Sequence, residues 1–112
     1  MPREKGMNRY SITAPLWQYS AMKGTWFFVT IPKKESAALK KGFGQKRKGW
    51  GSIPVLATIH ATTWSTSIFP DAKSGCYILP VKAKIRKQEA LLLNVPIRIA
   101  MTVNVRAIVG IE

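Results

Sequence analysis

The stretch Cys76–Lys87, CYILPVKAKIRK, decides how the rest of the chain is interpreted. An apolar run stops at Pro80 and passes directly into a basic segment. A proline cannot donate to a β-ladder, and its fixed φ angle suits the start of a helix. We therefore predict a strand that ends at Pro80 and a helix after it, with Val81, Ile85 and Leu92 on one side of the helix. The basic residues of this segment are Lys82, Lys84, Arg86 and Lys87.

The same order of features occurs earlier in the chain, around Pro32. The apolar run Trp26–Ile31 (WFFVTI) precedes this proline, and Lys33–Lys41 (KKESAALKK) follows with good helix formers and basic residues near its end. Further on, Ile53–Ile59 (IPVLATI) matches Ile97–Val103 (IRIAMTV) in pattern. The alternation after Pro80 would by itself also fit a strand, and the clearer first copy favours the helix. We therefore predict two copies of a strand, strand, proline, helix, strand unit.

Alternating apolar residues predict the strands of both copies. The predicted strands are Asn8–Trp17, Trp26–Ile31, Ser52–His60, Thr62–Phe69, Cys76–Leu79 and Pro96–Val105. Pro70-Asp71 and Ser74-Gly75 are turn signals between two of them. The predicted organisation is a mobile N-terminal tail over 1–7, one domain over 8–106 with halves 8–60 and 62–106, and a C-terminal tail over 107–112.

Length and composition indicate a single folded domain. The chain has 112 residues, of which 46% are hydrophobic, and this is enough to bury a core without disulfides or metals. Its single cysteine, Cys76, cannot form an internal disulfide, so we expect a cytoplasmic protein. The apolar runs are too short for a membrane span, and the N-terminus has no apolar core typical of a signal peptide.

The charge balance is strongly basic. The formal net charge is +13, from 18 Lys+Arg against 5 Asp+Glu. Such an imbalance favours polyanionic partners, above all DNA or RNA. The alternative is that the charge only keeps the protein soluble, since net charge is an argument about association and not about fold.

Several motifs follow one another in a recognisable order between Tyr10 and Val105. They are Ala14–Trp17 (APLW), Trp26–Pro32 (WFFVTIP), Gly49–Ser52 (GWGS), Thr62–Pro70 (TTWSTSIFP) and Tyr77–Lys82 (YILPVK). In this order they resemble the bacterial domain-of-unknown-function family numbered nineteen-oh-five. That family is also found joined to a YdeI/OmpD-associated domain of the bacteriocin-protection type, which these residues do not include.

The resemblance implies a mainly β fold. The expected architecture is a small double-split β-barrel of about six strands with two short capping helices, similar in plan to the AbrB and MazE swapped-hairpin barrels. In that group two chains each contribute a strand–helix–strand unit. The internal duplication would let one chain supply both units, so we expect a monomer. This chain departs from the family at Leu93–Pro96 (LNVP), where a Gly-Asp-type turn is frequent. The family has no established activity, so the resemblance informs fold more than function.

Residues that could support catalysis or bind a metal are few. His60 and Cys76 could act together only if folding joined them, and an edge histidine and a packed small hydrophobe are the simpler interpretation. Glu35 and Glu89 are interpreted as helix-surface charges. One Cys and one His do not supply the ligands of a zinc site. We predict no enzyme, no metal and no cofactor, and a bond from His60 to Cys76 or Asp71 would be the sign of a weak enzyme.

Three basic segments are candidate nucleic-acid contacts. The lysines of the two helix regions would lie at symmetry-related places on one face and match successive phosphates of a duplex. In Gly42–Gly51, glycines would expose backbone N–H groups to an anion while Phe43 and Trp50 stack on bases. Alternatively, the lysines only solvate helices. For the two aromatic residues we favour the interpretation that they pin the loop to the core. The candidate residues are Lys33, Lys34, Lys40, Lys41, Lys46, Arg47, Lys48, Lys82, Lys84, Arg86 and Lys87.

A second function hypothesis is a binding or protection module for a small molecule or peptide, with an incidental basic surface. A pocket at the barrel end, lined by Trp17, Trp64 and Phe69, would hold that ligand. A barrel filled by side chains would count against it. We rank it below the first hypothesis, a non-enzymatic domain that binds DNA or RNA.

Overall fold

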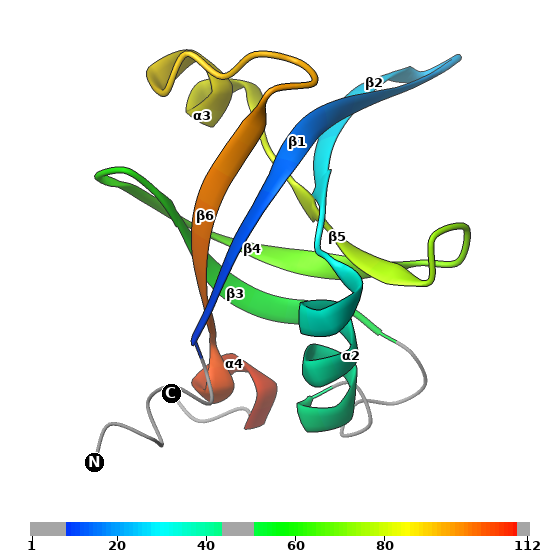
Figure 1. The fold of residues 1–112 in the computed structure, drawn as a ribbon, viewed down its shortest axis with the longest axis vertical. Helices are drawn as coiled ribbons and strands as arrows, with labels where there is room; N and C mark the ends of the chain where they lie inside the picture. The colour runs from blue at the N-terminus through cyan, green and yellow to red at the C-terminus, as the bar shows by residue number, and fades with distance from the viewer. Residues whose placement is uncertain (1–8, 44–50, 110–112) are drawn as a thin grey trace.

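The computed structural model describes residues 9–43 and 51–109, which form a closed barrel with the strand order β1-β2-β5-β4-β3-β6 (Figure 1). All neighbouring strands are antiparallel. The strands are β1 (Arg9–Ala21), β2 (Gly24–Thr30), β3 (Ile53–Ile59), β4 (Thr62–Asp71), β5 (Cys76–Pro80) and β6 (Pro96–Val103). The helices of the described residues are α2 (Lys33–Gly42), α3 (Ala83–Gln88) and α4 (Val105–Val109). The predicted small β-barrel is therefore confirmed.

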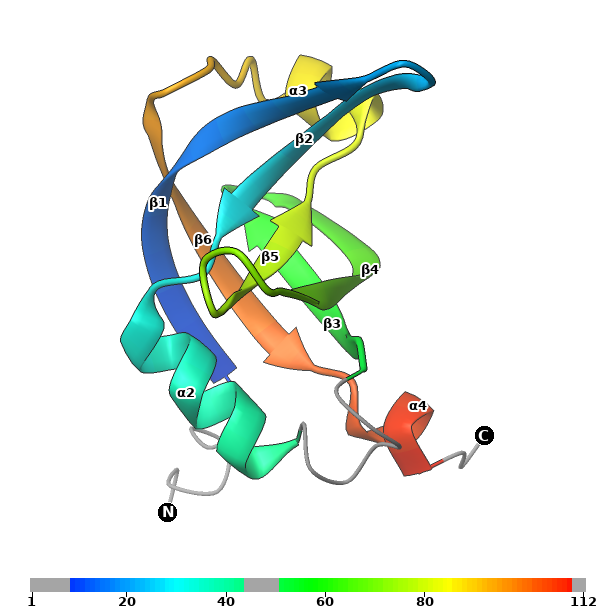
Figure 2. The ribbon, with the colours of Figure 1, turned by 90° about the vertical axis from the view of Figure 1, so that its right-hand side faces the viewer.

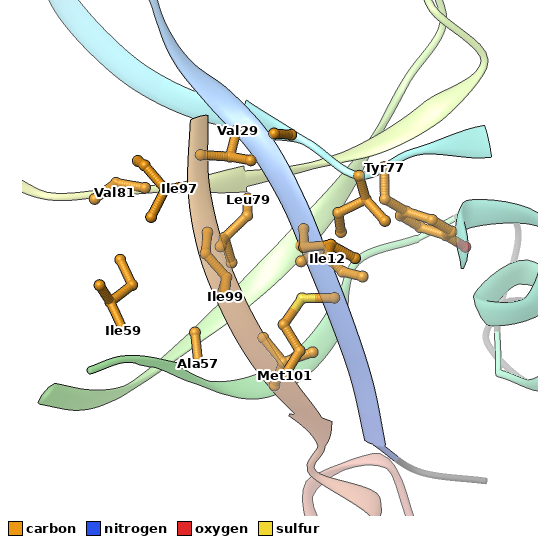
Figure 3. Close-up of a cluster of buried hydrophobic side chains, with 14 of the residues drawn as sticks. Ile12, Val29, Ala57, Ile59, Tyr77, Leu79, Val81, Ile97, Ile99 and Met101 are labelled. Atoms are coloured by element: carbon orange, nitrogen blue, oxygen red, sulfur yellow. The ribbon is translucent and has the colours of Figure 1, made fainter. Parts of the chain in front are cut away.

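Aliphatic side chains fill the barrel interior (Figure 3). The strands alternate as predicted, because every second residue points inward. In β3, for example, Ile53, Val55, Ala57 and Ile59 are buried, and the residues between them are half-buried or exposed. Other side chains from the remaining strands that meet them in the interior include Ile12, Val29, Leu79, Ile99 and Met101. Because these side chains occupy the interior, the candidate binding residues lie on the outer surface.

Strand β1 changes its partner at a pair of prolines. Pro15 lies directly opposite Pro96, and neither residue can donate to the ladder, so the pairing with β6 ends there. From Leu16 to Ala21, β1 pairs with β2 instead. The predicted strand, which ends at Trp17, is too short. Residues Gln18–Ala21 continue β1 and pair with the start of β2. The β1–β2 hairpin projects beyond the barrel as a two-stranded ribbon (Figures 1 and 2).

The strand registers match the predicted repeat. If β1, β2 and β3 exchange places with β4, β5 and β6, in that order, each pair of neighbouring strands becomes another pair of the same barrel. For example, the pair β1–β2 becomes the pair β4–β5. Thr30 and Ile78, which each stand two residues before a proline, are direct partners. Ala57 and Met101, which the two matching patterns align, are also direct partners. A twofold axis between the halves requires that residues at equivalent positions of the two copies face each other where the axis crosses the sheet. The internal duplication stays a prediction, and these registers support it.

The two predicted helices begin after their prolines, but α3 is shorter than expected. Val81 and Ile85 are buried on its inner side as predicted. Leu92 lies beyond the end of the helix and is 65% exposed, so its predicted place on the helix is wrong. Ala90, which has a left-handed φ of 51°, follows α3 closely and helps turn the chain away from the helix axis. In the unusual LNVP turn, Asn94 supplies a left-handed residue with a φ of 64°.

A third helix, α4, corrects the predicted two. The sequence predicts a last strand that runs to Val105 and a C-terminal tail from residue 107. The strand instead ends at Val103, and Val105–Val109 form a helix. Asn104 explains the change, because its Oδ1 accepts a hydrogen bond of 3.2 Å from the N–H of Ala107, as an N-cap does. The predicted N-terminal tail, residues 1–7, lies outside the described residues.

Candidate nucleic-acid interface

The two basic helix regions lie at opposite ends of the molecule along its longest axis (Figures 1 and 2). The expectation that they share one face is therefore wrong. The exchange of β1, β2 and β3 with β4, β5 and β6 also exchanges the α2 end of the barrel with the α3 end. Each end therefore carries one set of cations. The set on α2 consists of Lys33, Lys34, Lys40 and Lys41.

The glycine-rich loop falls largely outside the described residues. Lys46, Arg47, Lys48 and Trp50 belong to that part of the chain. Phe43, at the start of the loop, is half-buried and packs against the core. The structure thus confirms that Phe43 itself packs against the core.

The segment after Pro80, here called the basic segment, is anchored by its apolar residues. It comprises Lys82, Lys84, Arg86 and Lys87. The N–H of Val81 donates a hydrogen bond of 2.9 Å to the carbonyl of Phe27, and Ile85 is 4% exposed. Because these residues hold the segment against the barrel, its three lysines are left exposed. In residues 9–43 and 51–109, no carboxylate lies within ion-pair distance of these lysines.

Arg86 differs from the three lysines because its guanidinium has partners in the protein. Its Nη1 donates a hydrogen bond of 2.8 Å to the carbonyl of Val81. Its Cζ lies 3.6 Å from the centre of the Phe27 ring, in cation–π geometry. The side chain is half-buried. Arg86 therefore fastens α3 to β2, and we assign it a structural role in addition to its predicted contact with phosphate.

Two hollows flank the basic segment and share Lys82. The first, here called the hairpin hollow, has a volume of about 360 Å³ and lies beside β2, where this strand extends past its pairing with β5. Its lining is Thr25, Trp26, Phe27, Thr66, Pro80, Val81, Lys82, Ala83 and Arg86. The second has a volume of about 330 Å³ and includes Trp64, Lys84 and Gln88 in its lining. The α3 end thus offers recessed surface bordered by cations.

The projecting β1–β2 hairpin carries four aromatic residues on its outer side, here called the aromatic face. They form two directly opposite pairs, Trp17 with Phe28 and Tyr19 with Trp26. The ring centroids are 5.1 Å apart in the first pair and 6.1 Å apart in the second. Tyr19 is 52% exposed and Trp26 is 45% exposed. Trp26 also borders the hairpin hollow, so the aromatic face and the basic segment meet there.

The three residues predicted to line a ligand pocket lie in different surroundings. Trp17 packs on Phe28 and donates a hydrogen bond of 2.8 Å from Nε1 to Thr30 Oγ1. Trp64 belongs to the core, and its indole N–H has no hydrogen-bond partner among the described residues. Phe69 is exposed on β4. Neither hollow beside the basic segment is lined by more than one of the three.

Glu89 joins the turn after α3 to the turn between β3 and β4. Its carboxylate accepts a hydrogen bond from Thr62 Oγ1, and its Oε1 lies 2.6 Å from His60 Nδ1. The hydrogen bond from Thr62, and then the one from His60, lower the pKa of Glu89 below its ordinary value. The Glu89 side chain is only 12% exposed, so its interpretation as a helix-surface charge is wrong. Sequence reasoning missed this cluster because 29 residues separate His60 from Glu89.

The contacts of His60 and Cys76 differ from those of a Cys-His pair. His60 is exposed and bonds to Glu89, whereas Cys76 is buried, as the simpler interpretation of both residues predicted. Asp71 accepts a hydrogen bond of 2.8 Å from Ser74. Across residues 9–43 and 51–109, no group of three or more His, Cys, Asp or Glu residues could hold a metal ion. In the same residues no helix has the length and apolar character needed to cross a membrane.

Comparison with known proteins identifies the domain. The family profile described as "Domain of unknown function (DUF1905)" matches residues 13–101. The chain belongs to the DUF1905 family. No curated protein matches the sequence of this DUF1905 chain. The matched residues contain the aromatic face, the basic segment and the Glu89 cluster. Family membership thus defines the domain, and its function has to be argued from this surface.

Proposed function

We propose that this DUF1905 chain is a non-enzymatic module that binds a polyanion, DNA or RNA, at the α3 end of the barrel. The observation that carries the proposal is the basic segment. Lys82, Lys84 and Lys87 are exposed around recessed surface and, in the part of the chain that the structure describes, have no carboxylate within ion-pair distance. Phosphate contacts of this kind supply affinity with little sequence preference, since the phosphate backbone is the same at every base. We expect one chain to bind as a monomer.

The α3 end is favoured over the α2 end because it combines cations with an accessible aromatic ring. Trp26 borders the hairpin hollow and is nearly half exposed. The hollow beside α2 is also bordered by lysines, Lys33 and Lys40, but the aromatic residue in its lining, Tyr77, is 1% exposed. Nucleic-acid surfaces that hold unpaired bases combine positive charge with exposed aromatic side chains.

The alternative function is a binding or protection module for a small molecule or peptide. Such a function requires a ligand-sized cavity inside the barrel or at its end. The filled interior and the different surroundings of Trp17, Trp64 and Phe69 favour the nucleic-acid proposal over it.

The test is binding to mixed-sequence DNA and RNA across a salt series. Changing Lys82, Lys84 and Lys87 together to Gln should weaken binding and reduce the slope of log K against log salt by about 2 if each lysine neutralises one phosphate of a single strand. The matched control changes Lys33, Lys34 and Lys41 to Gln and removes the same charge at the α2 end. A similar loss in both variants would mean that net charge, and not the α3 end, drives binding. Negligible wild-type binding at low salt would overturn the proposal.

A further inference from the structure

We infer that the nucleic acid bound at the α3 end is single-stranded, and that its bases stack on the exposed rings of Tyr19 and Trp26. This inference rests on the proposed function and deepens it by naming the substrate class. Its basis is the geometry of the hairpin, which projects beyond the barrel (Figures 1 and 2). Both residues of the outer pair are exposed to solvent.

The two rings are placed to receive bases. Tyr19 and Trp26 are direct partners near the free end of the ribbon, and their ring planes are tilted by 33°. About half of each side chain is open to solvent. The inner pair, Trp17 and Phe28, lies only two residues further along each strand, about 7 Å away along the ribbon. The aromatic face therefore offers a short row of rings rather than one isolated side chain.

Positive charge lies beside these rings. Trp26 and Lys82 line the same hollow, so a strand whose bases stack on the aromatic face can place its phosphates near the basic segment. Lys23, in the hairpin turn just beyond the outer pair, adds another exposed cation. Base–aromatic stacking needs an accessible base face, which single strands offer and a duplex keeps within its own stack.

Hairpin stability alone explains only part of this arrangement. Opposite aromatic residues do stabilise a strand pair. Trp17 and Phe28 fit that role well, because both are half-buried and Trp17 is fixed by its hydrogen bond to Thr30. The outer pair lies near the free end of the ribbon, and both of its residues are about half exposed. Two adjacent aromatic rings left exposed beside a cationic hollow combine the features of a surface that stacks bases.

The experiment compares oligothymidylate of about twelve nucleotides with a duplex of equal length at low salt, by fluorescence anisotropy of labelled oligonucleotides. The wild-type chain should bind the single strand more tightly. Trp26→Ala should weaken single-strand binding roughly 5- to 150-fold, with a much smaller effect on the duplex. Trp26→Phe should keep most of the affinity, since it keeps a stacking ring. The matched control is Phe69→Ala, which removes a ring of similar exposure outside both hollows beside the basic segment.

The outcomes separate this inference from the proposed function. Equal binding of single strand and duplex, unaffected by Trp26→Ala but weakened in the triple lysine variant, would overturn the inference and leave the proposed function standing. Failure of the wild-type chain to bind either oligonucleotide would overturn both. Thermal unfolding of each variant monitors folding. If Trp26→Ala proves unstable, the comparison of Trp26→Phe with Tyr19→Ala decides, because a stacking role predicts that Tyr19→Ala binds the single strand more weakly than Trp26→Phe does.

Discussion

The amide N–H of Tyr77 donates a hydrogen bond of 3.0 Å to Ser36 Oγ, although 41 residues separate the two in the chain. The same hydroxyl donates a hydrogen bond of 2.8 Å to the carbonyl of Ile31. Ser36 is 4% exposed. One buried side chain therefore joins α2 both to Ile31, the residue that follows β2, and to β5.

Replacement of Ser36 by Ala should destabilise the barrel. The change removes both hydrogen bonds from a buried site, and a buried polar group that loses its partner costs about 1–3 kcal/mol. We expect a decrease of that size in the free energy of unfolding, measured by urea denaturation. Ser65→Ala, at an exposed position of β4, is the matched control and should change stability by less than about 0.5 kcal/mol. Equal stabilities of the two variants would contradict the role given to Ser36.

Glu89 should make stability depend on pH. Its folded pKa lies below the ordinary value of 4.5 because Thr62 and His60 donate to the carboxylate. A depressed folded pKa stabilises the fold above the unfolded pKa, and this contribution is lost as the pH falls from about 4.5 through the folded pKa. Glu89→Gln should therefore lower the free energy of unfolding near neutral pH, with a deficit that shrinks below about pH 4.5. Urea denaturation over that range is the measurement, and a deficit independent of pH would contradict the assignment.

Arg86 should matter more for stability than the lysines around it. Arg86→Met removes the bond to the Val81 carbonyl and the contact with the Phe27 ring. A hydrogen bond from a charged group and a cation–π contact together predict a loss of about 2–4 kcal/mol. Lys82→Met, at an exposed position of the same segment, should stay within about 0.5 kcal/mol of the wild type. Thermal unfolding that ranked the two variants in the opposite order would show that Arg86 does not fasten α3.

Much of the fold could be predicted because its signals are local. The alternation of β3 and β6 and the stops at Pro32 and Pro80 each act within a few residues, and all appear in the structure. The pattern match also aligned Ala57 with Met101, which are partners in the barrel. Asn104 shows a local signal that went unused, because an N-cap residue before an apolar run predicts α4.

The surface could not be predicted in the same way, because it depends on contacts between distant parts of the chain. The arrangement of the two basic helix regions follows from closure of the barrel, which no single segment encodes. The projection of the hairpin depends on where β2 leaves β5, at Phe28. In the sequence, Glu89 cannot be distinguished from any other carboxylate at the end of a helix. Its hydrogen bond with Thr62 forms only when the fold brings the two residues together. For the same reason, the sequence placed Arg86 among the free cations.

Ala90 offers a test in which a substitution should stabilise the protein. Its φ of 51° is left-handed, a conformation that costs an L-residue roughly 1–2 kcal/mol and that glycine adopts readily. Glycine also makes the unfolded chain more flexible, which offsets about 0.4–1 kcal/mol of the gain. We therefore expect Ala90→Gly to raise the free energy of unfolding by up to about 1.6 kcal/mol. Ala38→Gly, at an exposed position inside α2, should lower it by about 1 kcal/mol. If urea denaturation showed both glycine variants to be destabilised equally, the backbone at Ala90 would not be left-handed.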